Sequence, residues 1–232
     1  MSNEANAAGE PSQIIVVPTA VGEGRLHRYC APANPRAVLA LGHGAGGGVQ
    51  ARDLQALASE LPQADIEVVL VEQPWAVAGK KVAPAPSQLD AAWLPLIAAI
   101  DRHGLPLIAG GRSAGARVAC RTASEVGAVG LVALACPLHP PGRPQSSRID
   151  ELTSVTCPAL VIQGTRDTFG TAAELRRAVS RDKSVKVRAI ADADHGLKVA
   201  AAAATTTAAA LEAVVKAETR ESDRPVGRET GQ

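Results

Sequence analysis

Residues 105–120 read Leu-Pro-Leu-Ile-Ala-Gly-Gly-Arg-Ser-Ala-Gly-Ala-Arg-Val-Ala-Cys. An apolar run leads into Gly111-Arg-Ser-Ala-Gly115 and a run suited to a helix follows, so the stretch predicts a strand, a sharp turn and a helix. Glycine at positions 111 and 115 lets the strand and the helix approach and leaves the Ser113 hydroxyl outside the packing. The pattern Gly-x-Ser-x-Gly is common in a chain with 21 glycines, so its meaning depends on what accompanies it.

An aspartate and a histidine accompany it, each after a predicted strand. Residues 158–163 predict a buried strand, and Asp167 lies in the loop after it. Residues 185–190 predict the next strand, and His195 lies in the loop that follows. A serine hydroxyl needs a base to take its proton, and the base needs an anion to fix its tautomer. We therefore expect Ser113 to be a nucleophile, His195 its base and Asp167 the orienting acid.

Two other aspartates compete for the role of the acid. Asp192 and Asp194 lie next to His195 in the sequence. Side chains that are so close along the chain rarely point into one hydrogen bond, whereas a residue after the neighbouring strand can approach the ring from the side. The sequence therefore favours Asp167.

A glycine-rich segment upstream predicts an oxyanion hole. Residues 37–41 form an apolar run that leads into Gly42-His-Gly-Ala-Gly-Gly-Gly48. A turn of this kind beside the elbow can direct a backbone N–H at the carbonyl oxygen under attack, and we expect Ala45 and Ala114 to supply the two N–H groups. Removing one such donor typically raises the barrier by about 3–4 kcal/mol.

Four more side chains are candidate substrate contacts. His43 is interpreted first as a structural residue that holds the oxyanion loop, with substrate contact as the alternative. Arg112 either meets an anionic substrate or is solvated. Trp75 either packs in the core or forms a wall of the substrate pocket, and His139 in a proline-rich loop can face the mouth of the site.

The composition argues for one α/β domain and against several partners. Of the 232 residues 46% are hydrophobic but only 2% are aromatic, so Ala, Val, Leu and Ile must build the core, which suits a parallel sheet buried on both faces. The net charge of +1 without a basic stripe argues against nucleic acid. The cysteines form no CxxC pair and are interpreted as small buried side chains in a reducing compartment, so we expect no metal or cofactor; they are Cys30, Cys120, Cys136 and Cys157.

The ends of the chain are predicted to lie outside the folded domain. Residues 1–10 lack the apolar core of a signal peptide, and the uncharged stretch 199–211 is shorter than the roughly 20 residues of a membrane span. We expect a cytoplasmic protein without a membrane partner, with disordered residues 1–11, a domain over 12–218 and a flexible tail over 219–232. The sequence leaves the oligomeric state open.

The order of elements predicts an eight-stranded, mostly parallel sheet with an antiparallel first edge, helices on both faces and no cap domain. Residues 136–156 are expected to form a covering loop with one helical turn and not a helical cap. The predicted strands are 13–17, 25–30, 37–41, 66–71, the strand of the elbow, 129–135, 158–163 and 185–190. The predicted helices are 49–61, 87–103 with a bend or break at Pro95, the helix of the elbow up to 126, 171–180 and 196–217.

Five stretches together resemble the α/β-hydrolase superfamily, and within it the small, lidless branch typified by dienelactone hydrolase. They are residues 41–48, 110–119, 137–142, 163–170 and 194–195, and they are most similar to bacterial predicted hydrolases related to the testis-expressed and KANSL-type α/β-hydrolase-like proteins. The resemblance implies a hydrolase fold and the triad Ser113, Asp167 and His195. Dienelactone hydrolase has a cysteine nucleophile where this chain has Ser113, so its substrates are not carried over.

These observations favour a serine hydrolase that cleaves an ester, thioester or related acyl bond of a small molecule through an acyl-enzyme. One alternative is a catalytically silent interaction module on the same fold. Another is a dinucleotide-binding oxidoreductase, because Gly42–Gly47 matches G-x-G-x-x-G and Glu72 ends the next predicted strand. The second alternative leaves Ser113, Asp167 and His195 unexplained.

Overall fold

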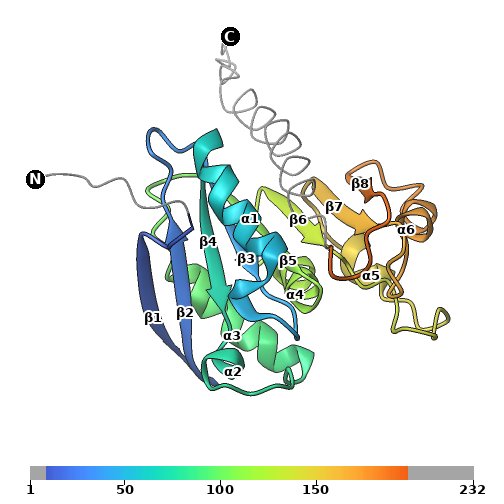
Figure 1. Cartoon of the computed structure of the whole chain (residues 1–232), viewed down its shortest axis with the longest axis horizontal. Helices are drawn as coiled ribbons and strands as arrows, with labels where there is room; N and C mark the ends of the chain where they lie inside the picture. The colour runs from blue at the N-terminus through green and yellow to red at the C-terminus, as the bar shows by residue number, and fades with distance from the viewer. Residues whose placement is uncertain (1–8, 198–232) are drawn as a thin grey trace, which may run out of the picture.

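One sheet of eight strands organises residues 9–197, the part of the chain that the computed structural model describes (Figure 1). The strands are β1 (Gln13–Thr19), β2 (Gly22–Tyr29), β3 (Ala37–Gly42), β4 (Ile66–Glu72), β5 (Leu107–Arg112), β6 (Gly130–Leu134), β7 (Ala159–Gly164) and β8 (Val185–Ile190). Their order across the sheet is β1-β2-β4-β3-β5-β6-β7-β8. The pairs β1–β2 and β2–β4 are antiparallel and all others are parallel, which confirms the predicted topology.

The strand order creates a crevice beside β3. From β3 the chain passes to β4 on one side, and it then returns to β5 on the other side before moving on to β6. The connections after β3 and β5 therefore leave in opposite directions, and the crevice between them is where ligands bind in open parallel sheets. The glycine-rich segment after β3 and Ser113 after β5 both lie at this point.

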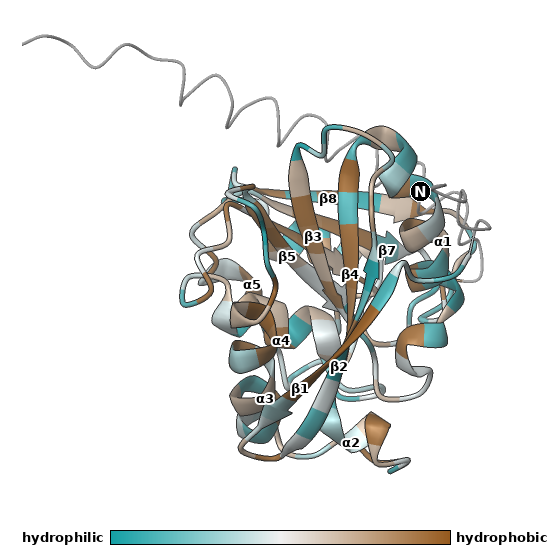
Figure 2. Ribbon diagram, turned by 90° about the vertical axis from the view of Figure 1, so that its left-hand side faces the viewer, coloured by the Kyte–Doolittle hydropathy of each residue, from teal (hydrophilic) through white to brown (hydrophobic). Residues whose placement is uncertain are grey.

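Helices cover both faces of the sheet, as predicted. Figure 2 shows α3, α4 and α5 on one side of the strands and α1 on the other. The helical segments are η1 (Gly48–Gln50), α1 (Arg52–Glu60), η2 (Leu61–Ala64), α2 (Pro74–Val77), α3 (Pro86–Ala98), α4 (Ala114–Thr122), α5 (Ile149–Thr153) and α6 (Ala172–Ala178). None of the helices within residues 9–197 is both long and apolar enough to cross a membrane.

Aliphatic side chains form a separate core on each face. Alternate residues of β3 point to opposite sides, so Val38 packs with the cluster under α3 and α4, while Leu39 packs with the cluster under α1. Both residues are fully buried, and burying such a side chain is worth roughly 1.5–3 kcal/mol. The central strands are rigidly held at both faces, which fixes the loops at their carboxyl ends.

Four predicted helices differ in their bounds. The helix of the elbow ends at Thr122 instead of residue 126, and α6 spans Ala172–Ala178 instead of 171–180. The expected helix over 49–61 is divided into η1, α1 and η2. The helix α3 begins at Pro86 instead of Ser87, because proline is well suited to the first helical position, and it runs through Pro95 without a break. It ends at Ala98, before the expected residue 103.

The segment between β6 and β7 contains only the five-residue helix α5, so the predicted absence of a cap is confirmed. The expected last helix over 196–217 lies almost wholly outside the described residues. The predicted disorder of 1–11, the domain limits 12–218 and the tail 219–232 also reach beyond those residues and stay predictions.

Candidate active site

Ser113 occupies the sharp turn between β5 and α4. Its backbone has φ 52° and ψ −109°, a strained conformation for a residue with a side chain, and its N–H donates to Leu134 O at 2.9 Å. The turn is tight because α4 lies against β3: a Cβ on Gly115 would collide with the carbonyl of Gly42. Glycine at position 115 is therefore a steric requirement of the elbow.

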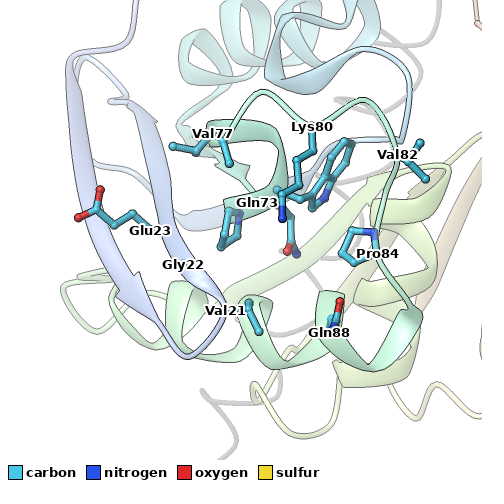
Figure 3. Close-up of a pocket in the computed structure, with 12 residues that line it drawn as sticks. Val21, Gly22, Glu23, Gln73, Val77, Lys80, Val82, Pro84 and Gln88 are labelled. Atoms are coloured by element: carbon cyan, nitrogen blue, oxygen red, sulfur yellow. The ribbon is translucent and has the colours of Figure 1, made fainter.

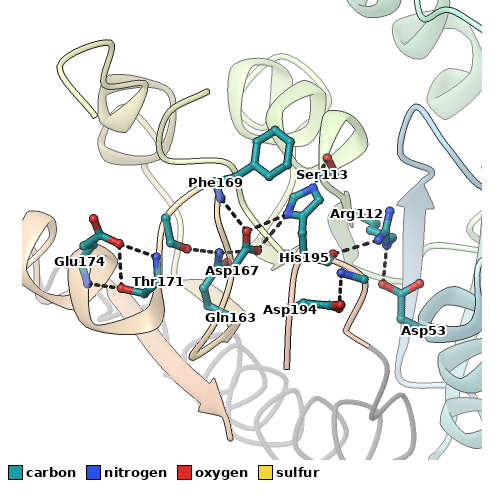
Figure 4. A network of polar contacts seen from close by, with 12 residues as sticks. Asp53, Arg112, Ser113, Gln163, Asp167, Phe169, Thr171, Glu174, Asp194 and His195 are labelled. Carbon is teal, nitrogen blue, oxygen red and sulfur yellow. Dashed lines mark hydrogen bonds and ion pairs between the residues drawn. The ribbon is translucent and has the colours of Figure 1, made fainter. Parts of the chain in front are cut away.

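The structure brings together Ser113, His195 and Asp167 (Figure 4). The Nε2 atom of His195 lies 2.9 Å from Ser113 Oγ, across 82 residues of sequence. The Nδ1 atom lies 3.0 and 2.9 Å from the two carboxylate oxygens of Asp167. Because an ionised carboxylate only accepts, Nδ1 carries the ring proton and Nε2 is left to accept from the serine hydroxyl. This is the geometry that a serine nucleophile with a histidine base requires.

The two competing aspartates are directed elsewhere. Asp192 forms an ion pair with Arg166 at 2.7 Å. Asp194 accepts a hydrogen bond from the backbone N–H of Gly196 at 2.9 Å. Asp167 is the carboxylate within hydrogen-bonding distance of the His195 ring.

Asp167 is held by two further donors. Its carboxylate is buried and accepts from the backbone N–H of Phe169 at 2.8 Å and from Gln163 Nε2 at 2.9 Å. Gln163 is fully buried at the end of β7 and also donates to Gly170 O at 2.6 Å. Hydrogen bonds to a buried carboxylate compensate for its lost hydration, and these contacts hold the Asp167 side chain in its orientation toward His195.

Phe169 stacks on the ring of His195. The ring centroids are 4.1 Å apart and the planes differ by 28°. The stack covers one face of the imidazole and restricts rotation of the ring. Phe169 also lines the pocket at Ser113, so it shields the histidine on the side where a substrate would enter.

The glycine-rich loop packs directly on the elbow. A Cβ on Gly44 would lie 3.3 Å from Ser113 Cβ, and Ala45 lines the same pocket as Ser113. Ala114 is the first residue of α4, where an N–H has no partner inside the helix. Within residues 9–197, the N–H groups of Ala45 and Ala114 have no hydrogen-bond acceptor, which leaves both available to a ligand.

His43 lies behind this loop instead of in the pocket. Its Nε2 accepts from the backbone N–H of Gln73 at 3.1 Å, which requires Nδ1 to carry the proton and to donate to Gly44 O at 2.9 Å. Burial lowers the pKa of His43 below its ordinary value, and the contacts with Gly44 and Glu72 only partly oppose this. The neutral ring thus joins the loop after β3 to the end of β4.

Arg112 has an arrangement that neither interpretation of the sequence included. Its Nε forms an ion pair with Asp53 Oδ2 at 2.9 Å, and its Nη2 donates to the carbonyl of His195 at 2.9 Å. Asp53 is buried; burial raises its pKa, and the charge of Arg112 opposes that shift. Arg112 lines the pocket, but its charge is balanced by Asp53, and its Nη2 is engaged by the loop that carries His195.

Trp75 and His139 do not line the pocket of Ser113. Trp75 packs against the ring of His43 with a centroid distance of 5.3 Å. His139 donates from Nδ1 to Pro140 O at 2.9 Å, and its Nε2 lies 3.8 Å from Glu174. The structure does not bring either residue into this pocket, and a substrate contact by either one stays a prediction.

The pocket at Ser113 has a volume of about 450 Å³. It lies between the glycine-rich loop, the start of α1 and the loop that carries His195, and this volume is within the range of small-molecule sites. Among the described residues, no three His, Cys, Asp or Glu side chains are arranged to hold a metal ion.

A sequence profile of the family described as alpha/beta hydrolase domain matches residues 35–222. The chain belongs to this family. The superfamily predicted from the sequence is therefore confirmed, whereas the relation to the testis-expressed and KANSL-type proteins stays a prediction. No curated protein sequence matches this α/β hydrolase.

Three solved structures share the fold of this α/β hydrolase. A lidless serine hydrolase from Xanthomonas campestris has 18% identity and a TM-score of 0.70, with 89% of this chain and 94% of that one covered. Est1E from Butyrivibrio proteoclasticus has 12% identity and a TM-score of 0.73, with coverage of 88% and 100%. A thermophilic esterase from Thermogutta terrifontis has 14% identity and a TM-score of 0.63, with coverage of 88% and 98%. At these identities the likeness concerns the fold.

Sequence reasoning missed three residues of the site in this α/β hydrolase: Asp53, Gln163 and Phe169. A signal existed for Phe169, the one phenylalanine of the chain, because it stands two residues after the predicted acid. For Asp53 there was none, since an aspartate in the first turn of a helix is ordinary. The dinucleotide alternative loses its support, because Glu72 hydrogen-bonds His27 at 3.0 Å and the glycine-rich loop packs on Ser113.

Proposed function

We propose that this protein is a serine hydrolase that cleaves an ester, thioester or related acyl bond of a small molecule. The observation that carries the proposal is the 2.9 Å contact between His195 Nε2 and Ser113 Oγ, with Nδ1 of the same ring on Asp167. The family of the chain and the esterases among the similar structures support a hydrolase.

In the proposed reaction, Ser113 Oγ attacks the carbonyl carbon while its proton passes to His195 Nε2. The carbonyl oxygen becomes an oxyanion that accepts hydrogen bonds from the N–H groups of Ala45 and Ala114. When the tetrahedral intermediate collapses, the bond to the leaving alcohol or thiol breaks and the leaving group takes the proton from Nε2. Water then attacks the acyl-enzyme by the same route and releases the acid. Asp167 stays ionised and stabilises the imidazolium.

The pocket favours small acyl groups. It is formed by the loops themselves without a cap, so little apolar surface is available for a long chain. Est1E has been solved with ferulic acid bound, which supports including esters of aromatic acids among the substrates to be tested.

The test is labelling of the full chain with a fluorophosphonate probe, followed by hydrolysis of p-nitrophenyl esters of increasing length and of methyl ferulate. We expect labelling at Ser113 and fastest turnover with the short or aromatic acyl groups. Ser113→Ala should abolish labelling and lower kcat by about 10⁶-fold. Residual wild-type-like turnover in Ser113→Ala would contradict the proposal, and absence of labelling in the wild type would favour the silent interaction module.

A further inference from the structure

A second pocket, separate from the site above, lies beside α2 (Figure 3). Its volume is about 320 Å³, and it shares no lining residue with the pocket of Ser113. The turn between β1 and β2, the helix α2, the loop over 79–85 and the start of α3 surround it. We refer to it as the α2 pocket. Its apolar walls are Val21, Pro74, Val77, Val82 and Pro84.

Gln73 and Trp75, on either side of Pro74, line the α2 pocket, and each has a polar side-chain atom without a hydrogen-bond partner. Gln73 and Trp75 are only 4% and 9% exposed. Gln73 Nε2 donates to Leu89 O at 3.1 Å, which fixes the amide and leaves Oε1 as the acceptor. Within the described part of the chain, neither Gln73 Oε1 nor Trp75 Nε1 has a hydrogen-bond partner. Leaving a buried donor and a buried acceptor unpaired is unfavourable, and a ligand that offers both complementary groups removes the penalty.

The charged side chains around the α2 pocket indicate the charge that such a ligand would carry. One basic residue, Lys80, and one acidic residue, Glu23, line it. In Figure 3 the side chain of Lys80 extends into the space near Gln73, whereas the carboxylate of Glu23 points away from it. An ammonium group directed into a pocket with apolar walls favours an anion.

We propose that the α2 pocket binds a small organic acid that also carries one hydroxyl or amide hydrogen-bond donor. The carboxylate of the acid forms an ion pair with Lys80 and accepts a hydrogen bond from Trp75 Nε1. The hydroxyl or amide of the acid donates a hydrogen bond to Gln73 Oε1. The apolar body of the acid lies against the valine and proline walls. Both polar atoms are inaccessible to solvent in this structure, so binding includes a rearrangement of the wall that exposes them to the ligand. The volume lies near the lower limit for ligand pockets, roughly 300 Å³, which restricts the acid to one ring or one short branched chain.

Isothermal titration calorimetry on the full chain tests this proposal with 4-hydroxybenzoate, mandelate and N-acetyl-leucine as probes. Benzoate lacks the donor and 4-hydroxybenzamide lacks the charge, so they serve as matched ligand controls. We expect at least one of the three acids to bind, and Lys80→Gln and Trp75→Phe to weaken it by about tenfold or more. Lys81→Gln, an exposed neighbour that does not line the pocket, should bind like the wild type.

The Ser113→Ala variant separates this site from the candidate active site. Retained binding in that variant, together with loss in Lys80→Gln, supports the α2 pocket whatever the fate of the proposed hydrolase activity. The proposal is overturned if none of the three acids binds at millimolar concentration, if benzoate and 4-hydroxybenzamide bind as well as the best acid, or if Lys80→Gln and Trp75→Phe leave the affinity unchanged.

Discussion

The Nη2 atom of Arg112 donates a hydrogen bond to the carbonyl oxygen of His195 at 2.9 Å. The residue before the candidate nucleophile thus holds the loop that carries the candidate base. Asp53 on α1 forms an ion pair with the same guanidinium. The side chain of Arg112 is only 14% exposed and that of Asp53 only 1% exposed. Arg112 therefore connects α1, the end of β5 and the loop of His195, which are far apart in the sequence. We infer that Arg112 positions the base.

Replacing Arg112 should affect turnover and stability together. In Arg112→Ala the His195 loop loses its tether, and a displacement of the base of about 1 Å lowers kcat by about 10²-fold with a smaller effect on KM. Asp53 is left buried without its partner, which should reduce the free energy of unfolding by about 3–5 kcal/mol. Steady-state kinetics and urea unfolding measure the two effects.

Arg52→Gln provides the matched control for this prediction. Arg52 also lines the pocket of Ser113 but takes no part in the contact with His195. If both arginines acted only through their charge, Arg112→Ala and Arg52→Gln would have similar kcat and KM values. Equal kinetics of Arg112→Ala and Arg52→Gln would therefore refute the positioning role.

Gly115→Ala should disrupt the elbow. The added methyl group would meet the backbone of Gly42, which cannot rotate away as a side chain can, so the variant should lose about 1–3 kcal/mol or more of stability and most of its fluorophosphonate labelling. Gly46→Ala is the control from the glycine-rich loop, because nothing lies within 4 Å of a Cβ there. Thermal unfolding and labelling of both proteins give the comparison, and a tolerated Gly115→Ala would contradict the steric argument.

The stability of the fold should depend on pH through His43. Burial depresses the pKa of His43 in the folded protein below 6.5, so the unfolded chain binds more protons at acidic pH. The neutral ring makes its full contribution to the free energy of unfolding above about pH 6.5. This contribution is lost as the pH falls through the folded-state pKa, and the free energy of unfolding then decreases by at most about 1.4 kcal/mol per pH unit.

Urea unfolding of His43→Gln between pH 7.5 and pH 5 checks the role of this histidine. The variant should be less stable than the wild type at pH 7.5 and should show a shallower decline toward acidic pH. His103→Gln is the control, since His103 lies at the surface with its side chain 65% exposed. Parallel pH profiles of the wild type and His43→Gln would show that another group titrates.

Phe169 should contribute to turnover through the ring of His195. Phe169→Leu removes the stacked ring but keeps an apolar side chain, and loss of an aromatic pair is worth about 0.5–1.5 kcal/mol. We expect kcat to fall about two- to tenfold, while Phe169→Tyr retains the stack and stays near the wild type. The kinetic pH profile adds a readout of His195, and an unchanged kcat in Phe169→Leu would exclude the role.

Local patterns made the fold and the three central residues predictable. The largely apolar runs of β3, β4 and β5 suit a parallel sheet that is buried on both faces, and this interpretation needs no knowledge of distant residues. The motif of the elbow is equally local, since it lies within residues 111–115, although the clash that requires glycine at position 115 comes from Gly42 on β3. Asp167 and His195 follow from the rule that the loops after parallel strands gather at one edge of the sheet.

The supports of the site could not be derived in this way. Arg112 pairs with Asp53 only because β3 and β5 are neighbours in the sheet, and it reaches a carbonyl 83 residues further along the chain. Gln73 faces both His43 and the α2 pocket for the same kind of reason. Which buried polar groups meet depends on how the packed elements lie in space, and neither hydrophobic periodicity nor motif spacing carries that information.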